Sequence, residues 1–306
     1  PSRSAWVFRS GLSALAKRST ILDPLTRMIS SQPCLATRKI ETANPPQSAG
    51  FTKERDRELT TETASEEPRA RPFNRMIAFD RVSKRYPSGQ QALANLSFTL
   101  ARGEFAFITG HSGAGKSTLL KLVLGIERPS GGSLVVNGHD LMAMSPNTLP
   151  SYRRQIGTVF QDHQLLNDHS VFDNVALPLE ISGLDPREGK RRVRAALDKV
   201  GLLSKEKMSP MALSGGEQQR VGIARAVVNT PRIILADEPT GNLDPELSAE
   251  IMALFAQFMS VGVSLLVASH DRALIDGLGY RILTLEEGKL SSEATPHIKG
   301  AAANEY

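Results

Sequence analysis

Apolar and polar positions form a dense, regular pattern from Met76 onward. Seven segments have the alternating or continuous apolar pattern of β-strands: 76–82, 93–100, 104–110, 133–138, 154–162, 232–238 and 263–270. Helices are expected after Gly115, with Gly125 placed to end the first of them, over most of 171–208 and over 245–259. Apolar strands that alternate with helices indicate an α/β protein with a parallel sheet.

The first 75 residues lack this pattern. Residues 41–75 are rich in Pro, Ser, Thr and charge, so we expect residues 1–75 to be a disordered leader. The first forty residues contain seven Lys and Arg and one acid, Asp23, which is the composition of an organellar transit peptide. The alternative, which we favour, is a dispensable or over-extended start ahead of an initiator at Met76. Residues 291–306 are expected to form a polar tail.

The net charge of +5 is concentrated in that leader. Residues 1–75 contain 13 Lys and Arg against 8 Asp and Glu, whereas residues 76–306 contain 24 of each. The neutral remainder lacks the basic footprint of a nucleic-acid-binding protein, so we expect no nucleic-acid partner. No stretch approaches 18 uninterrupted apolar residues, so contact with a membrane is expected only through a partner. The single cysteine, Cys34, excludes an internal disulfide.

A phosphate-binding loop follows the strand predicted over 104–110. The stretch GHSGAGKST matches the P-loop pattern and lies between a predicted strand and a predicted helix, the context that makes this pattern specific. We expect Lys116 to reach the β- and γ-phosphates of a nucleotide, Ser117 to ligate Mg²⁺ and Thr118 to support the α-phosphate. The nucleotide ligands expected in this loop are Gly110, His111, Ser112, Gly113, Ala114, Gly115, Lys116, Ser117 and Thr118.

Polar residues end three predicted strands. Asp237 is expected to bind Mg²⁺, and Glu238 to polarise the attacking water as general base. Such a pair alone fits an exposed turn equally well, and the P-loop upstream favours the catalytic interpretation. A lone histidine is more often structural. His270, however, lies at a strand end, where ligands of α/β sheets collect, so we expect it near the γ-phosphate or the water. The amide of Gln161 can orient water or contact Mg²⁺. The expected catalytic set is Glu238, His270, Gln161 and Lys116.

The order of the motifs resembles that of ABC-transporter ATPase subunits. The motifs are a tyrosine before the first sheet, GHSGAGKST, VFQD, LSGGEQQR, IILADEPT, GNLD and SH, in that order between residues 76 and about 290. The resemblance implies ATP hydrolysis with Mg²⁺, with Tyr86 stacked on adenine. It implies that Gln161 senses a membrane partner, that His270 is the switch histidine and that Asp244 lies in a loop across a dimer. A simple strand-end tyrosine is the alternative for Tyr86.

LSGGEQQR is a second glycine-rich turn in a chain that already has a phosphate loop. It is the signature motif of the family that the chain resembles. A second turn is redundant for the chain's own nucleotide, but not if Ser214, Gly215 and Gly216 cap the γ-phosphate held by Lys116 of another copy. A helix beginning near Glu217 would direct its positive end across that interface. We therefore expect a homodimer with two shared sites.

Within that family the chain is most similar to the FtsE type. His111 and the stretch QDH fit this subgroup better than the lipoprotein-releasing or macrolide-export ATPases, which stay the alternative. The subgroup implies an FtsX-like integral membrane subunit, regulation of cell-wall hydrolysis in cell division and a location at the cytoplasmic face of the inner membrane. A soluble ATPase acting on DNA or ribosomes is disfavoured because such proteins carry coiled-coil inserts or tandem ATPase domains.

The expected fold is an α/β P-loop NTPase. An ABC-type ATPase domain is expected over residues 76–290, with a small antiparallel β subdomain over 76–109. A RecA-like parallel core is expected over 104–162 and 213–290, and an α-helical subdomain over about 163–212.

Overall fold

Two sheets organise the chain in the computed structural model, which describes residues 74–241 and 243–294. A four-stranded sheet has the order β2-β1-β4-β5, and a six-stranded sheet has the order β10-β9-β3-β8-β7-β6. The strands of the smaller sheet are β1 (Arg75–Arg85), β2 (Gln91–Ala101), β4 (Gly131–Val136) and β5 (His139–Asp140), and all its pairs are antiparallel. The expected leader lies outside the described residues, apart from its last two positions.

The six-stranded sheet is the centre of the fold. Its strands are β3 (Phe105–Thr109), β6 (Ile156–Val159), β7 (Ile233–Asp237), β8 (Ser264–Ala268), β9 (Arg281–Glu286) and β10 (Lys289–Ala294). Strands β9, β3, β8, β7 and β6 run parallel, and β10 pairs antiparallel with β9. The continuous apolar strands are explained by burial on both faces, since Ile234 and Ile233 of β7 belong to different hydrophobic cores.

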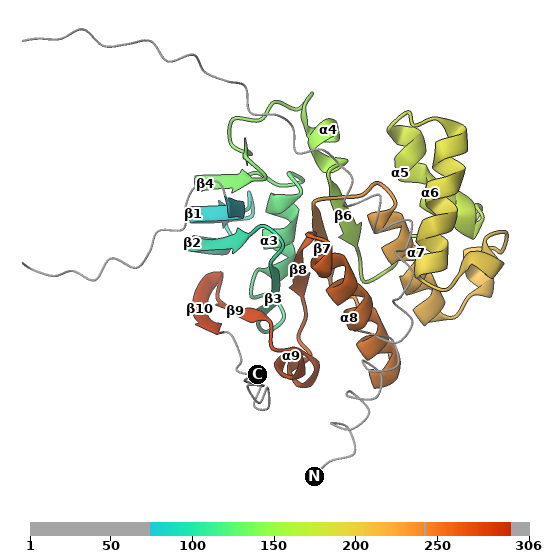
Figure 1. The fold of residues 1–306 in the computed structure, drawn as a ribbon. Helices are drawn as coiled ribbons and strands as arrows, with labels where there is room; N and C mark the ends of the chain where they lie inside the picture. The colour runs from blue at the N-terminus through green and yellow to red at the C-terminus, as the bar shows by residue number, and fades with distance from the viewer. Residues whose placement is uncertain (1–73, 242, 295–306) are drawn as a thin grey trace, which may run out of the picture.

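Helices cover both faces of this sheet (Figure 1). They are α3 (Lys116–Val123), α4 (Leu149–Arg153), α5 (Val171–Ile181), α6 (Pro186–Lys199), α7 (Gly215–Val227), α8 (Pro245–Ser260) and α9 (Arg272–Leu278), with short 3₁₀ turns at Leu203–Lys205 and Pro210–Ala212. One core joins the sheet to α5 through α9, and the other joins it to α3 and the antiparallel sheet. In the part of the chain that the structure describes, no helix is both long and apolar enough to cross a membrane.

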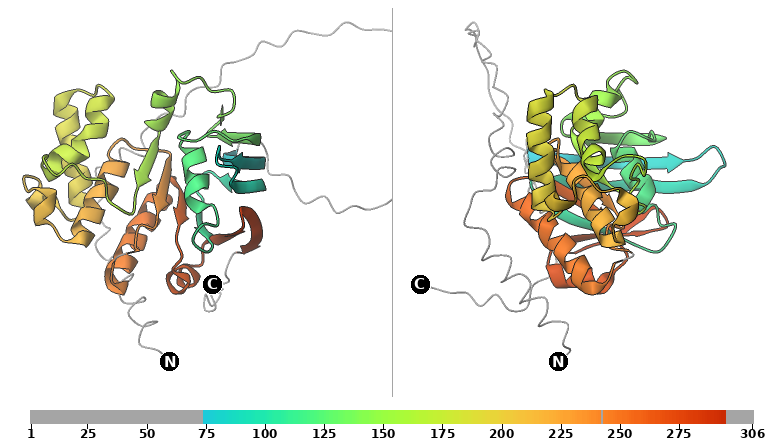
Figure 2. Two further views of the ribbon diagram at one scale, coloured as in Figure 1. Left: turned by 180° about the vertical axis from the view of Figure 1, so that it is seen from behind. Right: turned by 90° about the vertical axis from the view of Figure 1, so that its right-hand side faces the viewer.

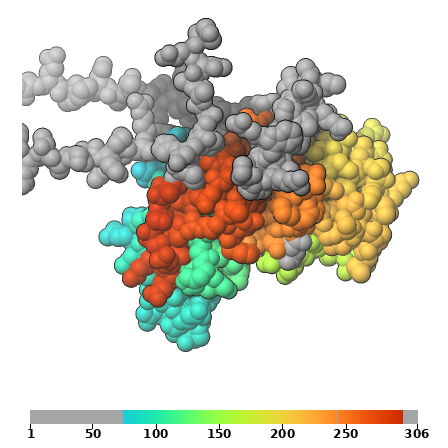
Figure 3. Space-filling model, turned by 90° about the horizontal axis from the view of Figure 1, so that it is seen from below, coloured from blue at the N-terminus to red at the C-terminus, as the bar shows by residue number. Residues whose placement is uncertain are grey.

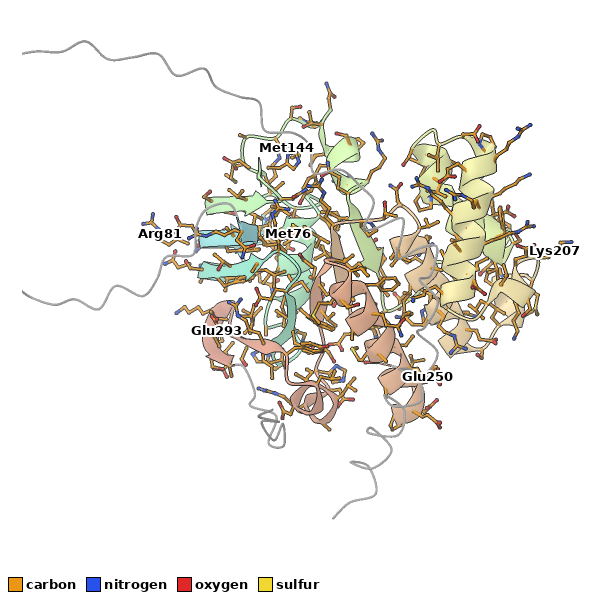
Figure 4. The ribbon with its side chains drawn as sticks, viewed as in Figure 1. Met76, Arg81, Met144, Lys207, Glu250 and Glu293 are labelled. Carbon is orange, nitrogen blue, oxygen red and sulfur yellow. The ribbon has the colours of Figure 1, made fainter. Side chains whose placement is uncertain are left out.

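The antiparallel sheet and the helical part lie at opposite ends of the molecule. Figures 1 and 2 show β1, β2 and β4 at one end and the α5–α6 pair at the other, with the parallel sheet between them. In the space-filling view from below, the surface passes from the cyan antiparallel strands through the red and orange C-terminal elements to the yellow helical part (Figure 3). The labels of Arg81 and Lys207 mark these two ends in Figure 4.

The antiparallel sheet is assembled differently from the prediction. Strand β3 belongs to the parallel sheet alone, and β4 and β5, which were expected in the parallel core, complete the smaller sheet. The reason is a register that places Val136 opposite Ile77 and Leu134 opposite Phe79. These four side chains are buried in one core, and this packing explains why β4 pairs with β1.

A C-terminal hairpin was missed by the sequence analysis. Strands β9 and β10 are joined by a turn in which Glu287 and Gly288 have φ angles of 47° and 75°, the left-handed pair that tight hairpin turns require. Strand β10 continues to Ala294, so the first four residues of the expected polar tail belong to this strand, and three of them pair with β9. Their polar sequence fits an exposed edge strand, because backbone hydrogen bonds rather than side-chain burial fix them there.

The predicted helical insert is present as α5, α6 and two 3₁₀ turns. Helix α5 begins with a capping box, in which Ser170 Oγ accepts the Asp173 N–H at 3.1 Å and the Asp173 carboxylate accepts the Ser170 N–H at 3.2 Å. Val193 and Leu197 of α6 pack into the core shared with α7. The helical part is therefore continuous with the core on the side that carries the signature motif.

Candidate active site

A cavity of about 710 Å³ lies at the carboxyl ends of the parallel strands, which is where α/β sheets bind ligands. Most of the residues expected to bind nucleotide, metal or water line it. The lining residues are Tyr86, Gln90, Ala92, Gly110, His111, Ser112, Gly113, Gly115, Lys116, Ser117, Thr118, Gln161, Asp237, Glu238 and His270. One exception is Ala114, which is buried within the loop. The others are Ser214, Gly215 and Gly216 of the signature motif and Asp244 of the loop before α8.

The curvature of the phosphate loop depends on glycine. Gly110 has φ 147° and Gly115 has φ 108°, and both lie against backbone. A Cβ atom at Gly110 would collide with the carbonyl oxygen of Leu285, and one at Gly115 would lie 2.7 Å from the carbonyl oxygen of Ala92. The loop can therefore approach strands β9 and β2 only without side chains at these two positions.

The first turn of α3 presents unpaired backbone donors to the cavity. Gly115 is the N-cap of α3 and supplies no side-chain cap, so the N–H groups of the first turn are available to phosphate oxygens. The Lys116 ammonium donates hydrogen bonds to the carbonyl oxygens of Gly110 at 2.8 Å and His111 at 3.3 Å, which keeps it over the loop. The hydroxyl of Tyr86 lies 3.3 Å from Thr118 Oγ1, so the Tyr86 side chain reaches the same end of the loop.

Asp237 is a partly buried carboxylate at the end of β7. Burial raises the pKa of Asp237 above its usual 3.8, with Glu238 adding to the increase, while the hydroxyl of Ser117 and the charge of Lys116 oppose it. An oxygen pair made of a carboxylate and a hydroxyl beside a phosphate loop suits Mg²⁺, which is usually bound by one or two carboxylates together with substrate phosphates. Within the described ranges, no three or more His, Cys, Asp and Glu side chains are grouped so that they could bind a metal ion.

Glu238 and His270 are paired at the ends of adjacent strands. The Glu238 carboxylate lies 2.8 Å from His270 Nδ1 and accepts the His270 backbone N–H at 3.3 Å. Glu238 has φ 48°, an uncommon backbone angle for a non-glycine residue, and its N–H donates to the Ala268 carbonyl oxygen at 2.9 Å. A Cβ atom added at Gly241 would lie 3.7 Å from Gln161 Nε2, so the Gln161 amide is adjacent to the turn that follows Glu238.

The signature residues lie outside this cavity. Ser214 and Gly215 are exposed, and Ser214 is the N-cap of α7 in a capping box with Glu217, so this helix begins two residues earlier than predicted. Gly216 is buried, and a Cβ atom there would collide with the side chain of Leu247. No residue of the chain's own phosphate loop contacts Ser214 through a hydrogen bond that the structure records.

The signature helix is instead joined to α8 and to the loop before it. Asp244 is exposed and caps α8, with its carboxylate accepting the Leu247 N–H at 2.9 Å. Arg220 of α7 forms an ion pair with Glu250 of α8 at 3.2 Å, and Figure 4 shows Glu250 on that helix. Ser214 and Asp244 thus lie at the starts of two helices that pack on each other, away from the nucleotide cavity.

Sequence reasoning missed Gln90 and Ala92, which line the cavity beside Tyr86. The signal was available, since Tyr-Pro-Ser-Gly is a turn sequence between two strands and turns return the chain to the same edge. The turn is closed by hydrogen bonds from the Tyr86 N–H to the Gln90 carbonyl oxygen and from the Gly89 N–H to the Tyr86 carbonyl oxygen, both 2.9 Å. The β1–β2 turn therefore forms one wall of the site.

Comparison with known proteins agrees with this geometry. Residues 93–241 match the ABC transporter family. The cell division ATP-binding protein FtsE of Escherichia coli K12 is 59% identical over 215 residues, which cover 70% of this chain and 97% of that protein. FtsE of Bacillus subtilis is 43% identical over 213 residues, which cover 70% of this chain and 93% of that protein. The chain belongs to the ABC transporter family of ATP-binding proteins.

Solved structures agree in fold as well as in sequence. The dimeric post-hydrolysis structure of the ATP-binding cassette MJ0796 with ADP and Pi has a TM-score of 0.67 and 33% identity, covering 72% of this chain and 99% of that one. The structure of cbiO1 from Clostridium perfringens, part of the ABC transporter complex cbiONQ, has a TM-score of 0.68 and 30% identity, covering 73% and 89%. The predicted fold class is confirmed, and the chain is an FtsE-like ABC-type ATPase.

Proposed function

We propose that this ATPase is the energy-coupling subunit of an FtsEX-like membrane complex, in which ATP-driven closure of a dimer acts on a membrane partner that regulates cell-wall hydrolysis in cell division. The observation that carries the proposal is the Glu238–His270 pair, 2.8 Å apart, in one cavity with the phosphate loop. The names of the E. coli and B. subtilis relatives support the assignment to cell division.

The chemistry follows from the positions of the side chains. Lys116 and the N–H groups at the start of α3 bind the β- and γ-phosphates of ATP, and Tyr86 stacks on the adenine. Ser117, Asp237 and Gln161 would supply oxygen ligands for Mg²⁺, which would neutralise negative charge on the phosphates. Glu238 accepts a proton from a water molecule while the oxygen of that water attacks the γ-phosphorus. The bond between the γ-phosphorus and the ADP oxygen then breaks. His270 orients the Glu238 carboxylate and the γ-phosphate.

The site is completed by a second copy of the chain. Ser214, Gly215 and Gly216 of one copy would cap the γ-phosphate bound by Lys116 of the other, and Asp244 would lie across the same interface. The exposure of Ser214, Gly215 and Asp244 supports this arrangement, because none of the three serves the nucleotide cavity of its own chain. The dimeric MJ0796 structures provide a precedent.

The helical part offers a surface for the membrane partner. Leu166 and Met208 are exposed, and Ser209 Oγ donates to the Asn167 carbonyl oxygen at 3.4 Å, so the segments that carry them are adjacent. Met211 is 70% exposed just beyond them, ahead of the signature motif. An apolar surface between the loop of Gln161 and the signature motif suits an FtsX-like integral membrane subunit. Through that subunit we place the ATPase at the cytoplasmic face of the inner membrane.

Capture of the membrane subunit tests this assignment. The full chain and the FtsX-like subunit of the same organism are co-expressed, solubilised in detergent and purified through a tag on the ATPase. We expect the FtsX-like subunit to co-purify, and Met211→Asp to reduce its capture, because a buried unpaired carboxylate in the interface is costly. Met142, 40% exposed on the segment after β5, provides the matched control, and Met142→Asp is expected to leave capture unchanged. Co-purification of a lipoprotein-releasing or macrolide-export membrane subunit instead would contradict the proposal.

A further inference from the structure

The side chain of Gln219 connects two loops of the active site from inside the signature helix. Gln219 is 1% exposed, and its amide spans the space between His163 and Pro239. His163 lies two residues after the expected water- and metal-binding Gln161, and Pro239 directly follows Glu238. One buried amide therefore contacts both segments that carry the proposed hydrolytic residues.

The chemistry of the partners fixes the direction of both hydrogen bonds. The Pro239 carbonyl oxygen can only accept, so it is the amide nitrogen of Gln219 that donates to it, at 2.8 Å. The amide oxygen then faces His163 Nδ1 at 2.5 Å, and Nδ1 must carry the hydrogen. If the amide turned over, its oxygen would face the Pro239 carbonyl oxygen and that bond would be lost, so the Pro239 carbonyl sets the orientation of Gln219.

A second side chain of α7 fixes the same loop. The guanidinium of Arg225 donates to the carbonyl oxygens of His163 at 2.6 Å and Gln164 at 2.7 Å. His163 and Gln164 have φ angles of 55° and 48°, a conformation that costs energy without such contacts. The loop after Gln161 is thus bound to α7 through its backbone and through a side chain.

The turn after Glu238 is held by hydrogen bonds to β8 and to α7. The Glu238 N–H is bonded to β8, the Gly241 N–H bonds the Glu238 carbonyl oxygen at 3.2 Å, and the Pro239 carbonyl oxygen is bonded to Gln219. Pro239 has no N–H of its own to contribute. The bond from Gln219 therefore joins this turn to α7, the helix whose first residues would face a second copy of the chain.

We propose that Gln219 is a positioning residue for hydrolysis: it keeps the Gln161 loop and the Glu238 turn in register with α7. A movement of α7, produced when Ser214 engages the nucleotide of a second copy, then reaches both segments together. The inference rests on the proposed role of Glu238. The relay is built from side chains of the chain itself and adds a function to a residue that does not line the nucleotide cavity.

Steady-state ATP hydrolysis and MgATP binding of full-length variants test the inference. Gln219→Leu removes both bonds, and Gln219→Glu places an oxygen against the Pro239 carbonyl oxygen. We expect either change to lower kcat about tenfold to a hundredfold, with KM changed less than about threefold, because misplaced catalytic groups affect the chemical step more than binding.

Two variants of His163 separate the hydrogen bond from its surroundings. Asn and Asp have nearly the same shape and both tolerate the left-handed backbone at this position. An Asn can donate to the Gln219 amide oxygen as His163 Nδ1 does, whereas an ionised Asp can only accept. We expect His163→Asn to keep kcat within about threefold of the unmodified chain and His163→Asp to lower it about tenfold or more.

Asn174 is the control for a purely structural amide. It is fully buried in the helical part and bonds Leu166 and Ser170, away from the Glu238 turn. Asn174→Leu should lower the melting temperature yet keep kcat within about twofold, measured well below every melting temperature. An equal loss of kcat in Asn174→Leu and Gln219→Leu overturns the proposal, as does unchanged kcat in Gln219→Leu.

The roles of Glu238 and Gln219 can be tested separately. Loss of turnover in Glu238→Gln with unchanged turnover in Gln219→Leu overturns the positioning role alone. Normal turnover in Glu238→Gln overturns the proposed base and the relay with it. Where Gln219→Leu does not fold, the His163 pair decides, and equal kcat values for His163→Asn and His163→Asp overturn the inference.

Discussion

The carboxylate of Glu238 accepts two contacts from His270, one from the ring nitrogen Nδ1 at 2.8 Å and one from the backbone N–H at 3.3 Å. The Glu238 side chain is 13% exposed and the His270 side chain 68% exposed, so the histidine covers a carboxylate that is largely enclosed. The ring and the backbone donor together fix the orientation of the proposed base at the end of β7.

Removing the His270 ring should slow hydrolysis without preventing ATP binding. In His270→Ala the backbone N–H still contacts Glu238, but the ring no longer orients the carboxylate or reaches the γ-phosphate. We expect kcat to fall about tenfold to a hundredfold, which is at or below the lower end of the range for acid–base groups, with ATP affinity within about threefold. Phosphate release and nucleotide titration measure the two quantities. His169→Ala, at an exposed histidine beside Asp168, is the control, and an unchanged kcat in His270→Ala would contradict the assignment.

The two signature glycines should respond differently to alanine. Nothing lies within 4 Å of a Cβ atom at Gly215, whereas one at Gly216 collides with Leu247. Gly216→Ala is therefore expected to destabilise the isolated chain by about 1–3 kcal/mol. Gly215→Ala should fold with unchanged stability and lose hydrolysis, because the added methyl group meets the nucleotide of the second copy. Chemical denaturation and phosphate release measure both. Full hydrolysis in Gly215→Ala would argue against a close approach at this residue.

The ionised Asp237 carboxylate should destabilise the folded, nucleotide-free protein. Burial raises the pKa of Asp237 above 3.8, so the folded chain binds this proton more tightly than the unfolded chain. The contribution of the protonated Asp237 to folding stability is therefore present at low pH. It is lost as the pH rises from the usual pKa of an aspartate through the raised pKa of the folded chain. At neutral pH, Asp237→Asn removes the cost of the buried charge and should raise the melting temperature of the nucleotide-free chain.

The same substitution should abolish the effect of Mg²⁺. In the unmodified chain, Mg²⁺ with ATP should raise the melting temperature above that with ATP alone, and this increment should shrink as the pH falls toward the pKa of Asp237, because metal and proton compete. Thermal unfolding with and without chelator measures the increment. An Asp237→Asn chain that still shows it would contradict the metal assignment.

The parallel core could be predicted because its signals are local. Strands β7 and β8 are mostly apolar, and polar residues stand at the end of β7 and directly after β8. The phosphate loop is contiguous in sequence. The sheet to which β4 belongs could not be predicted, since its alternation fits either sheet and its partner Ile77 is distant in sequence. The β9–β10 hairpin had a readable signal in Glu287 and Gly288, which the pattern analysis passed over.

Some features of the site could likewise be predicted from the sequence and others could not. Lys116, Asp237 and His270 follow strands, and the carboxyl ends of parallel strands meet, so their proximity was predictable. The contact of Gln219 with His163 joins residues 56 positions apart through the packing of α7 on a loop with left-handed backbone. No periodicity or spacing encodes such a contact, because it depends on how a helix and an irregular loop are placed in space.

The mass and nucleotide content of Glu238→Gln in Mg²⁺ and ATP test the central claim most directly. Size-exclusion chromatography with light scattering gives the mass, and extraction of the bound nucleotide gives its identity. If two copies share two sites and Glu238 is the base, the variant should run as a dimer that retains two ATP molecules and releases no phosphate. A monomer that binds ATP, or a variant that turns ATP over at the normal rate, would contradict the account.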